Sequence, residues 1–200
     1  MKHIPIQKHA GQPVQLVHNN GRIAKRTIIA FTDASIRTSG MGIGVATRCS
    51  DDGYASKTTL RAKHVARDIN ELEMGAIFLA LEATDQAADI VVYTDSQTAI
   101  HQMTGVTSTK KYERLTQLIL RAGRSRKGAT SVCKVKAHSG NEGNDLADAL
   151  AAEGTRSAYA FELPRDGDDL DIWRARHVEE EHVLCVRETP TGTRIFSDPI

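Results

Sequence analysis

Cysteine and long apolar runs are both scarce in this sequence of 200 residues. Its 3 cysteines, Cys49, Cys133 and Cys185, stand far apart without a Cys-x-x-Cys spacing, which argues against a disulfide framework and a zinc knuckle. No apolar run approaches the roughly 18 to 20 residues that span a bilayer, and the first residues lack the apolar segment of a secretion signal. We therefore expect no membrane partner and a reducing compartment: the cytoplasm, or the host cytoplasm if the source is viral.

A surplus of charge of one sign is also missing. The 26 Lys and Arg residues nearly balance the 25 Asp and Glu residues, so the net charge of +1 gives no sign of an anionic partner. With 40% hydrophobic and 26% charged residues, the composition excludes fibrous and wholly disordered chains. The length allows one full domain and a remainder too small for a second large core.

Periodicity and turn residues predict a mixed order of strands and helices. Three strands come first, the second and third as a hairpin, followed by helix, strand, two helices, strand and helix. The predicted strands cover 27–33, 41–49, 54–60, 88–95 and 131–136, and the predicted helices cover 69–86, 96–103, 112–122 and 143–154. We expect Gly123 and Gly154 to end the last two helices. This order is typical of an α/β fold with a mixed five-stranded sheet flanked by helices.

Composition changes near both termini and divides the chain into three parts. Residues 1–26 contain basic residues but no acidic one, and we interpret them as an irregular, basic N-terminal extension. The predicted elements fill a core domain over 27–157. Residues 158–200 form an acidic C-terminal appendage without an assigned role, in which 182–188 and 193–198 predict a β-hairpin.

Four carboxylates occupy positions where an α/β sheet can bring them together. Asp33 ends the first predicted strand, Asp95 ends the fourth, Glu73 lies early in the first long helix, and Asp148 lies in the last helix. Sites in open α/β sheets form at the carboxyl ends of strands, so we expect Asp33 and Asp95 to be neighbours. Carboxylates packed closely repel one another and are usually neutralised by a divalent cation. Oxygen ligands favour Mg²⁺ or Mn²⁺, and two such ions about 4 Å apart support phosphodiester hydrolysis.

Each of these acids also has an ordinary structural explanation. Asp33 could belong to a turn, and Asp148 could be surface charge. Glu73 could stabilise the positive end of a helix dipole, and Asp95 could cap the helix that follows it. The hypothesis of a metal site therefore depends on the ordered set of four acids.

The balanced net charge conceals a local imbalance between Thr104 and Lys136. This segment has nine basic residues and one acidic residue, Glu113, and the imbalance predicts phosphate binding. We call these residues the basic strip: Lys110, Lys111, Arg114, Arg121, Arg124, Arg126, Lys127, Lys134 and Lys136.

Four segments, IIAFTDAS, INELEMGAIFLALEA, VVYTDSQTAI and VKAHSGNEGNDLAD, resemble in this order the four motif blocks of type 1 ribonuclease H, over roughly residues 27 to 155. The resemblance implies a ribonuclease H-like sheet, with 27–157 as the catalytic domain. It also implies endonucleolytic hydrolysis of the RNA strand of an RNA/DNA hybrid, leaving 5′-phosphate and 3′-hydroxyl ends. Two Mg²⁺ ions per site would act with bound substrate, with Mn²⁺ as the alternative ion. The sequence does not identify a protein partner.

The resemblance assigns catalytic roles to five residues. Asp33 would bridge the two ions, Glu73 and Asp95 would complete the first metal site, and Asp148 would hold the second. Within the motif blocks, Glu73 and Asp148 fit the family pattern better than their neighbouring acids do. His138, in a glycine-rich loop, would help proton movement or product release.

The resemblance also implies polar contacts to the hybrid, whose RNA strand differs from DNA by its 2′-hydroxyl groups. The expected substrate contacts are Ser35, Asn70, Ser96, Gln97 and Asn144, with Lys110 and Lys111 of the basic strip as phosphate contacts. Asn70 has a second explanation, as a cap of the following helix.

One feature distinguishes this sequence from typical type 1 ribonucleases H, and two argue against other functions of the same fold. The family's basic handle with its tryptophans is short here, and the only tryptophan is Trp173, so we expect a form without the full handle. A 3′–5′ exonuclease of the same fold would resemble Asp-x-Glu on the first strand, but position 35 is Ser. A non-catalytic nucleic-acid-binding module of this fold usually lacks one or more acids, and none is lacking here.

Overall fold

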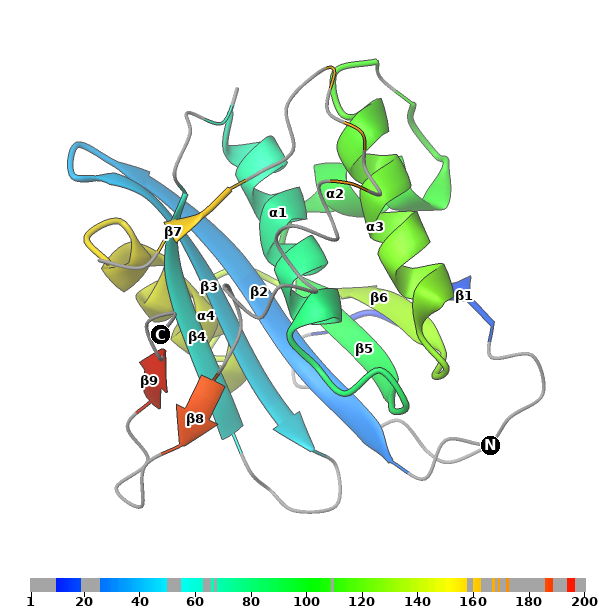
Figure 1. Ribbon diagram of the computed structural model, residues 1–200, viewed down its shortest axis with the longest axis horizontal. Coiled ribbons are helices and arrows are strands. Elements are labelled where there is room, and N and C mark those ends of the chain that lie inside the picture. Colours follow the sequence, from blue (N-terminus) through cyan, green and yellow to red (C-terminus); the bar gives the residue numbers. More distant parts are fainter. Residues whose placement is uncertain are drawn as a thin grey trace.

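The computed structural model describes residues 10–18, 26–49, 55–62, 66, 68–108, 110–157, 160–162, 167, 169, 172, 186–188 and 194–196. These residues form a mixed sheet with helices on both faces (Figure 1). The strands are β1 (Val14–Val17), β2 (Thr27–Arg37), β3 (Gly40–Cys49), β4 (Ala55–Ala62), β5 (Asp89–Thr94), β6 (Thr130–Lys134), β7 (Ala160–Phe161), β8 (Val186–Glu188) and β9 (Arg194–Phe196). The helices are α1 (Ile69–Glu82), α2 (Gln97–Thr104), α3 (Glu113–Ser125) and α4 (Glu142–Gly154). None of the described helices combines the length and apolarity needed to cross a membrane.

The described strands of the main sheet run in the order β1-β6-β5-β2-β3-β4-β7. Strands β2, β3 and β4 pair antiparallel, whereas β2, β5 and β6 run parallel to one another. The parallel strands therefore finish at the same end of the sheet, which we call its carboxyl end. In the pairing of β2 with β5, Thr32 lies opposite Thr94, so the residues that follow them are neighbours.

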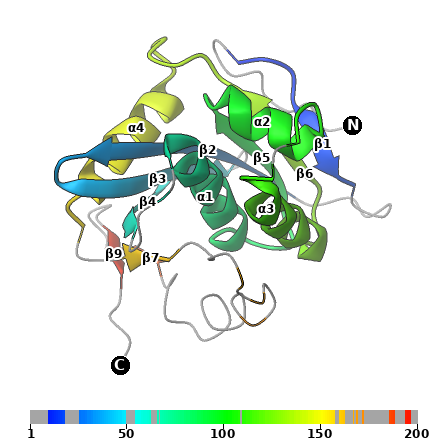
Figure 2. The same cartoon turned by 90° about the horizontal axis from the view of Figure 1, so that it is seen from above.

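The two faces of the sheet pack against different helices. Helices α1, α2 and α3 cover one face and share a core with Ala30 and Ala34 of β2 (Figures 1 and 2). The alternate residues Ile29 and Phe31 point to the other face, where they pack with α4. This alternation follows from the period of two along a strand and divides the core into two layers.

Two glycines in β3 let α4 approach the sheet closely. A Cβ atom added at Gly42 would lie 2.1 Å from the Ala151 carbonyl oxygen, and one at Gly44 would lie 2.2 Å from the Ala147 carbonyl oxygen. Any larger residue would push the helix away. These glycines therefore set the distance between the sheet and the helix that carries Asp148.

The predicted five-stranded core and its helices are confirmed, with two short edge strands added. Strand β1 lies within the extension that we interpreted as irregular, and it pairs antiparallel with β6. Four residues are too few to show a period, so the sequence pattern could not reveal this strand. Strands β8 and β9 pair antiparallel inside the segments predicted as a hairpin. Most of the appendage lies outside the described residues.

The prediction that Gly123 ends the third helix is wrong, because α3 continues to Ser125. Gly123 is buried inside the helix, and a Cβ atom there would lie 3.2 Å from a methyl group of Val17 in β1. The residue is small because an adjacent strand packs on it, rather than because the helix ends there.

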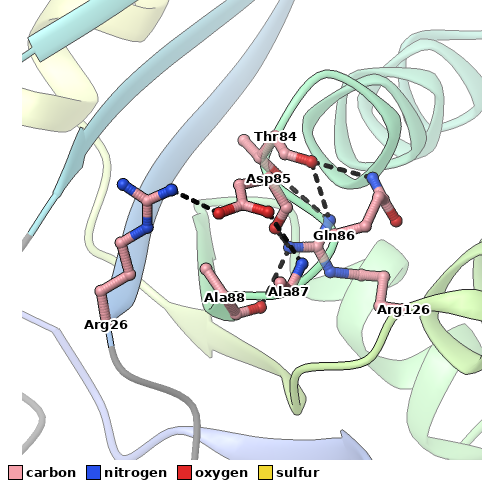
Figure 3. Close-up of polar contacts among 7 residues, drawn as sticks. All are labelled: Arg26, Thr84, Asp85, Gln86, Ala87, Ala88 and Arg126. Atoms are coloured by element: carbon pink, nitrogen blue, oxygen red, sulfur yellow. Dashed lines mark hydrogen bonds and ion pairs between the residues drawn. The ribbon is translucent and has the colours of Figure 1, made fainter.

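Arg126 fixes the corner at which α1 ends and β5 begins (Figure 3). Its side chain is 6% exposed, and its guanidinium donates to the carbonyl oxygens of Leu81, Thr84, Asp85 and Ala88. Burial lowers the pKa of Arg126 to about 10, against the opposing effect of nearby acids. This member of the basic strip therefore binds the protein's own backbone, and the expectation that it contributes to phosphate binding is wrong.

Candidate active site

Three of the predicted acids meet at the carboxyl end of the sheet. Each of Asp33, Glu73 and Asp95 offers a carboxylate oxygen, and these oxygens lie within 4.8 Å of one another; we call them the acid cluster. Asp33 lies in β2 just after Thr32, and Asp95 directly follows β5, so the parallel pairing of these strands brings them together. Glu73 comes from α1, which packs on β2 and β3.

Two members of the acid cluster are buried but poorly supplied with hydrogen-bond donors, and the third, Asp95, is partly exposed. Asp33 is 7% exposed and Glu73 is 6% exposed. The backbone N–H of Ala34 donates to Asp33 Oδ1 at 2.7 Å and to Glu73 Oε1 at 3.2 Å. Glu73 Oε2 is buried and has no hydrogen-bond partner among the described residues. Leaving a buried polar atom without a partner costs about 1 to 3 kcal/mol, so this oxygen marks a place for a ligand.

The surroundings of Asp33 and Glu73 favour their protonated forms when no cation is present. Burial raises the pKa of Asp33 to about 6, and the negative charges of Asp95 and Asp148 add to the rise. Hydrogen bonds with Glu73 and from Ala34 partly offset it. Burial, followed by the charge of Asp33, holds the pKa of Glu73 well above its ordinary value. A divalent cation would reverse this preference and keep both groups ionised.

The donor set of the acid cluster fits a hard divalent cation. All of the available donors are carboxylate oxygens, which suit Mg²⁺ or Mn²⁺ better than softer metals, and one of them is buried without a partner. Asp148 lies outside the group of three, although it is close enough for its charge to raise the pKa of Asp33. Asp148 is partly exposed on α4, where it could hold a second cation beside one bound by the acid cluster.

The segment after β5 is held by its own polar groups. The Lys134 ammonium donates to the backbone carbonyl of Asp95, so this member of the basic strip is bound to the protein. Ser96 is 9% exposed, and its hydroxyl accepts a hydrogen bond from the N–H of Ala99 as the N-cap of α2. The capping role that was an alternative for Asp95 therefore belongs to Ser96. Gln97 is exposed, with its side chain 2.7 Å from His101.

The glycine-rich loop before α4 presents His138 to solvent. His138 has a φ of 45°, a left-handed conformation that non-glycine residues rarely adopt, and Gly140 also has a positive φ, of 73°. Asn141 caps α4 by accepting a hydrogen bond from the N–H of Asn144. Asn144 itself is only 1% exposed, so its side chain does not face a substrate in this structure.

The first turn of α1 resolves the alternative for Asn70. The N-cap of α1 is Asp68, whose carboxylate accepts a hydrogen bond from the N–H of Glu71 at 3.0 Å. Asn70 is therefore not the cap, and it lies partly exposed one turn before Glu73. The spacing of Asp68 and Glu71 is typical of a helix start and could have revealed this cap from the sequence.

The basic strip is divided between the two ends of α3. Lys111 pairs with Asp68 beside the start of α1, whereas Lys127 and Gly128 bond to Gln86 beyond its end. A helix of 13 residues separates these ends by about 20 Å, at 1.5 Å per residue. The members of the strip near the start of α3 and from Lys134 onward lie toward the carboxyl end of the sheet. Ser35 also lies there, partly buried and 3.3 Å from Nε of Arg37.

Comparisons with known proteins agree on one family. The family model described as RNase H matches residues 25–156. A ribonuclease H from Jannaschia sp. (strain CCS1) is 27% identical over 154 residues, which cover 70% of this chain and 98% of that protein.

Two solved structures share the fold. The RNase H1 of the halophilic archaeon Halobacterium salinarum NRC-1 has 24% identity and a TM-score of 0.55, and the match covers 64% of this chain and 96% of that one. The LC11-RNase H1 in complex with an RNA/DNA hybrid has 19% identity and a TM-score of 0.50, with 63% of this chain and 97% of that one covered. At these identities, the two structures support the fold alone.

Proposed function

The chain belongs to the ribonuclease H family, and we propose that it cleaves the RNA strand of RNA/DNA hybrids internally, leaving 5′-phosphate and 3′-hydroxyl ends. The observation that carries this proposal is the acid cluster, in which Asp33 and Glu73 are buried and Glu73 Oε2 has no partner among the described residues. The match to the ribonuclease H family model and to the Jannaschia ribonuclease H supports the choice of substrate.

We propose that two divalent ions act at this site with bound substrate, Mg²⁺ first and Mn²⁺ as the alternative. Asp33, Glu73 and Asp95 would hold one ion, and Asp33 and Asp148 would hold the other. Such ions stabilise charge on the scissile phosphate and lower the pKa of the attacking water. The protein would position these carboxylates through its backbone, because Asp33 lies in a paired strand, Asp95 directly follows β5, and α1, which carries Glu73, packs on the sheet.

The remaining residues would orient the substrate and move protons. His138 is exposed on the loop before α4, where it can exchange a proton with solvent and with the leaving oxygen. Asn70, Gln97 and Lys110 are at least partly exposed and remain the best side-chain contacts. Ser96 and Asn144 are buried, so their contacts would require backbone groups or a local rearrangement.

We also propose that residues 27–157 form the catalytic domain, between the N-terminal extension (1–26) and the C-terminal appendage (158–200). One amendment is needed at the N-terminal boundary, since β1 completes the sheet although it precedes residue 27. The expected cytoplasmic location stays a proposal drawn from cysteine usage.

One assay tests the reaction and separates it from its rivals. An RNA/DNA hybrid labelled on each strand is incubated with the protein in Mg²⁺ or Mn²⁺, beside duplex DNA and duplex RNA. We expect internal cuts confined to the RNA strand of the hybrid, abolished by Asp95→Asn, with products that carry a 5′-phosphate. Binding without cutting in either ion would indicate a non-catalytic module, and degradation of DNA from its ends would indicate an exonuclease.

A further inference from the structure

A small polar network joins the start of α1 to the start of α3. Asp68 Oδ1 accepts a hydrogen bond from the N–H of Glu71, and Asp68 Oδ2 accepts one from the Tyr112 hydroxyl at 2.6 Å. The Lys111 ammonium donates to the same Oδ2 and lies 5.3 Å from the centre of the Tyr112 ring. Every polar atom of the Asp68 carboxylate therefore has a donor.

The network is held in place by the core below it. Tyr112 is 7% exposed and packs in the same core cluster as Leu72 of α1 and Leu115 of α3. Although burial alone would raise it, the hydrogen bonds from Lys111 and Tyr112 lower the pKa of Asp68 below its ordinary value. The pair is therefore ionised in the neutral range.

The position of the network couples it to the acid cluster. Asp68 caps the helix that carries Glu73 only five residues later, within the first turn and a half of α1. The acid cluster has little hydrogen-bonding support of its own, since Glu73 receives a single backbone donor. The direction of the Glu73 side chain thus depends on how firmly the first turn of α1 is held.

We propose that Lys111 is a positioning residue for Glu73 and acts through Asp68. In this arrangement Asp68 keeps the Lys111 ammonium away from the phosphates of the substrate. This inference rests on the proposed function and revises the expectation that Lys111 contacts phosphate. The neighbouring Lys110 is exposed and has no hydrogen bond or ion pair among the described residues, so it keeps that role.

Four variants separate positioning from phosphate binding: Lys111→Met, Asp68→Asn, the double variant, and Lys110→Met as the matched control. Asparagine caps helices about as well as aspartate, so Asp68→Asn removes the charge and keeps the cap. The affinity for hybrid is measured against salt concentration without divalent ions. The affinity of the substrate-free protein for Mn²⁺ is measured by calorimetry, and kcat is measured against Mg²⁺ concentration.

We expect Lys111→Met to weaken Mn²⁺ binding and to lower kcat, each by roughly two- to fivefold, without changing the salt dependence of hybrid binding. Lys111→Arg should restore both. Lys110→Met should instead make the slope of log K against log salt shallower by about 0.9, the loss of one phosphate contact.

The double variant tests the route through Asp68. Once Asp68 is Asn, Lys111→Met should have no further effect on Mn²⁺ binding. Asp68→Asn should also free the ammonium and steepen the salt slope by about 0.9, and this gain should disappear in the double variant.

Several results would overturn the inference. A shallower salt slope for Lys111→Met with unchanged Mn²⁺ binding would make Lys111 a phosphate contact. A lower melting temperature with unchanged Mn²⁺ affinity and kcat would make the network purely structural. The binding measurements need no cleavage, so an inactive wild-type protein would contradict the proposed function without deciding this inference.

Discussion

Both ends of α1 bury charged side chains, but Arg126, at the end next to the start of β5, has more hydrogen-bond donors in use than Asp33 and Glu73 have hydrogen bonds at the other end. There the Arg126 guanidinium donates to the backbone carbonyl oxygens of Leu81, Thr84, Asp85 and Ala88, of which Figure 3 draws the last three residues, and its Nε alone has no partner among the described residues. At the other end Asp33 and Glu73 are as deeply buried, yet they receive one shared backbone N–H between them. Removing a buried charge that is hydrogen-bonded leaves its partners unpaired and destabilises the fold. A buried charge with few hydrogen bonds already makes the native fold less stable. The comparison therefore separates a site that stabilises the fold from one that is completed by a ligand.

The strongest test of this comparison is Asp33→Asn. We expect cleavage of hybrid to fall roughly a thousandfold, because the shared metal ligand is lost. The metal-free protein should become more stable by about 1 to 3 kcal/mol at pH 8, because a repelling buried charge is removed. Single-turnover cleavage and urea unfolding measure the two effects. Asp145→Asn, an exposed acid of α4, is the control and should change neither.

Arg126→Met should have the opposite pattern. Removal of the guanidinium leaves several carbonyl oxygens without donors, so we expect the free energy of unfolding to fall by about 3 kcal/mol. The kcat of the folded fraction should stay within about twofold, since Arg126 is remote from the acid cluster. Urea unfolding and kcat are compared with those of Arg124→Met, an exposed neighbour. A loss of kcat at full folding would show that the two ends are coupled.

The acid cluster should also make the stability of the metal-free protein depend on pH. The folded pKa of Asp33 is about 6, against about 3.8 unfolded, so between these values the folded state binds more protons. Stability should therefore fall by about 1 to 3 kcal/mol as pH rises from 4 to 7. Unfolding in urea at several pH values measures this trend. Saturating Mg²⁺ should cancel most of the decline. Asp33→Asn should remove the part due to Asp33, while burial of Glu73, which also raises its pKa, leaves a smaller decline; an equal decline in that variant would contradict the assignment.

Of these four predictions, Lys134→Met should show the smallest effect. The ammonium donates to the Asp95 carbonyl, so its loss should let the segment after β5 move and should lower kcat by roughly fivefold. Stability should change by less than about 1 kcal/mol, because the site is partly exposed. Cleavage rates under saturating Mg²⁺ test this, with Lys136→Met as the exposed control. Equal losses in both variants would point to phosphate contacts instead.

The sequence predicted the parts of the site that depend on local pattern. Asp33 was predicted to end its strand, whereas β2 continues to Arg37, and Asp95, predicted to end the other strand, directly follows β5. The parallel direction of the two strands was still enough to place the two acids side by side. The roles of Arg126 and Lys111 depend on contacts with residues about 40 positions away. A run of basic residues does not show which side chains bind the protein itself, so the sequence predicted the whole basic strip as one phosphate-binding surface.

Strand β1 changes which edge of the sheet is open to another molecule. Without it, the backbone of β6 would be an open edge onto which a strand of another molecule could add, the usual route to sheet aggregation. Val14–Val17 occupies that edge, and the irregular register between Gln15 and Val17 makes the new border a poor template for further pairing. This strand precedes the residues that match the family model, 25–156, so the edge of β6 is covered by a segment outside the matched region.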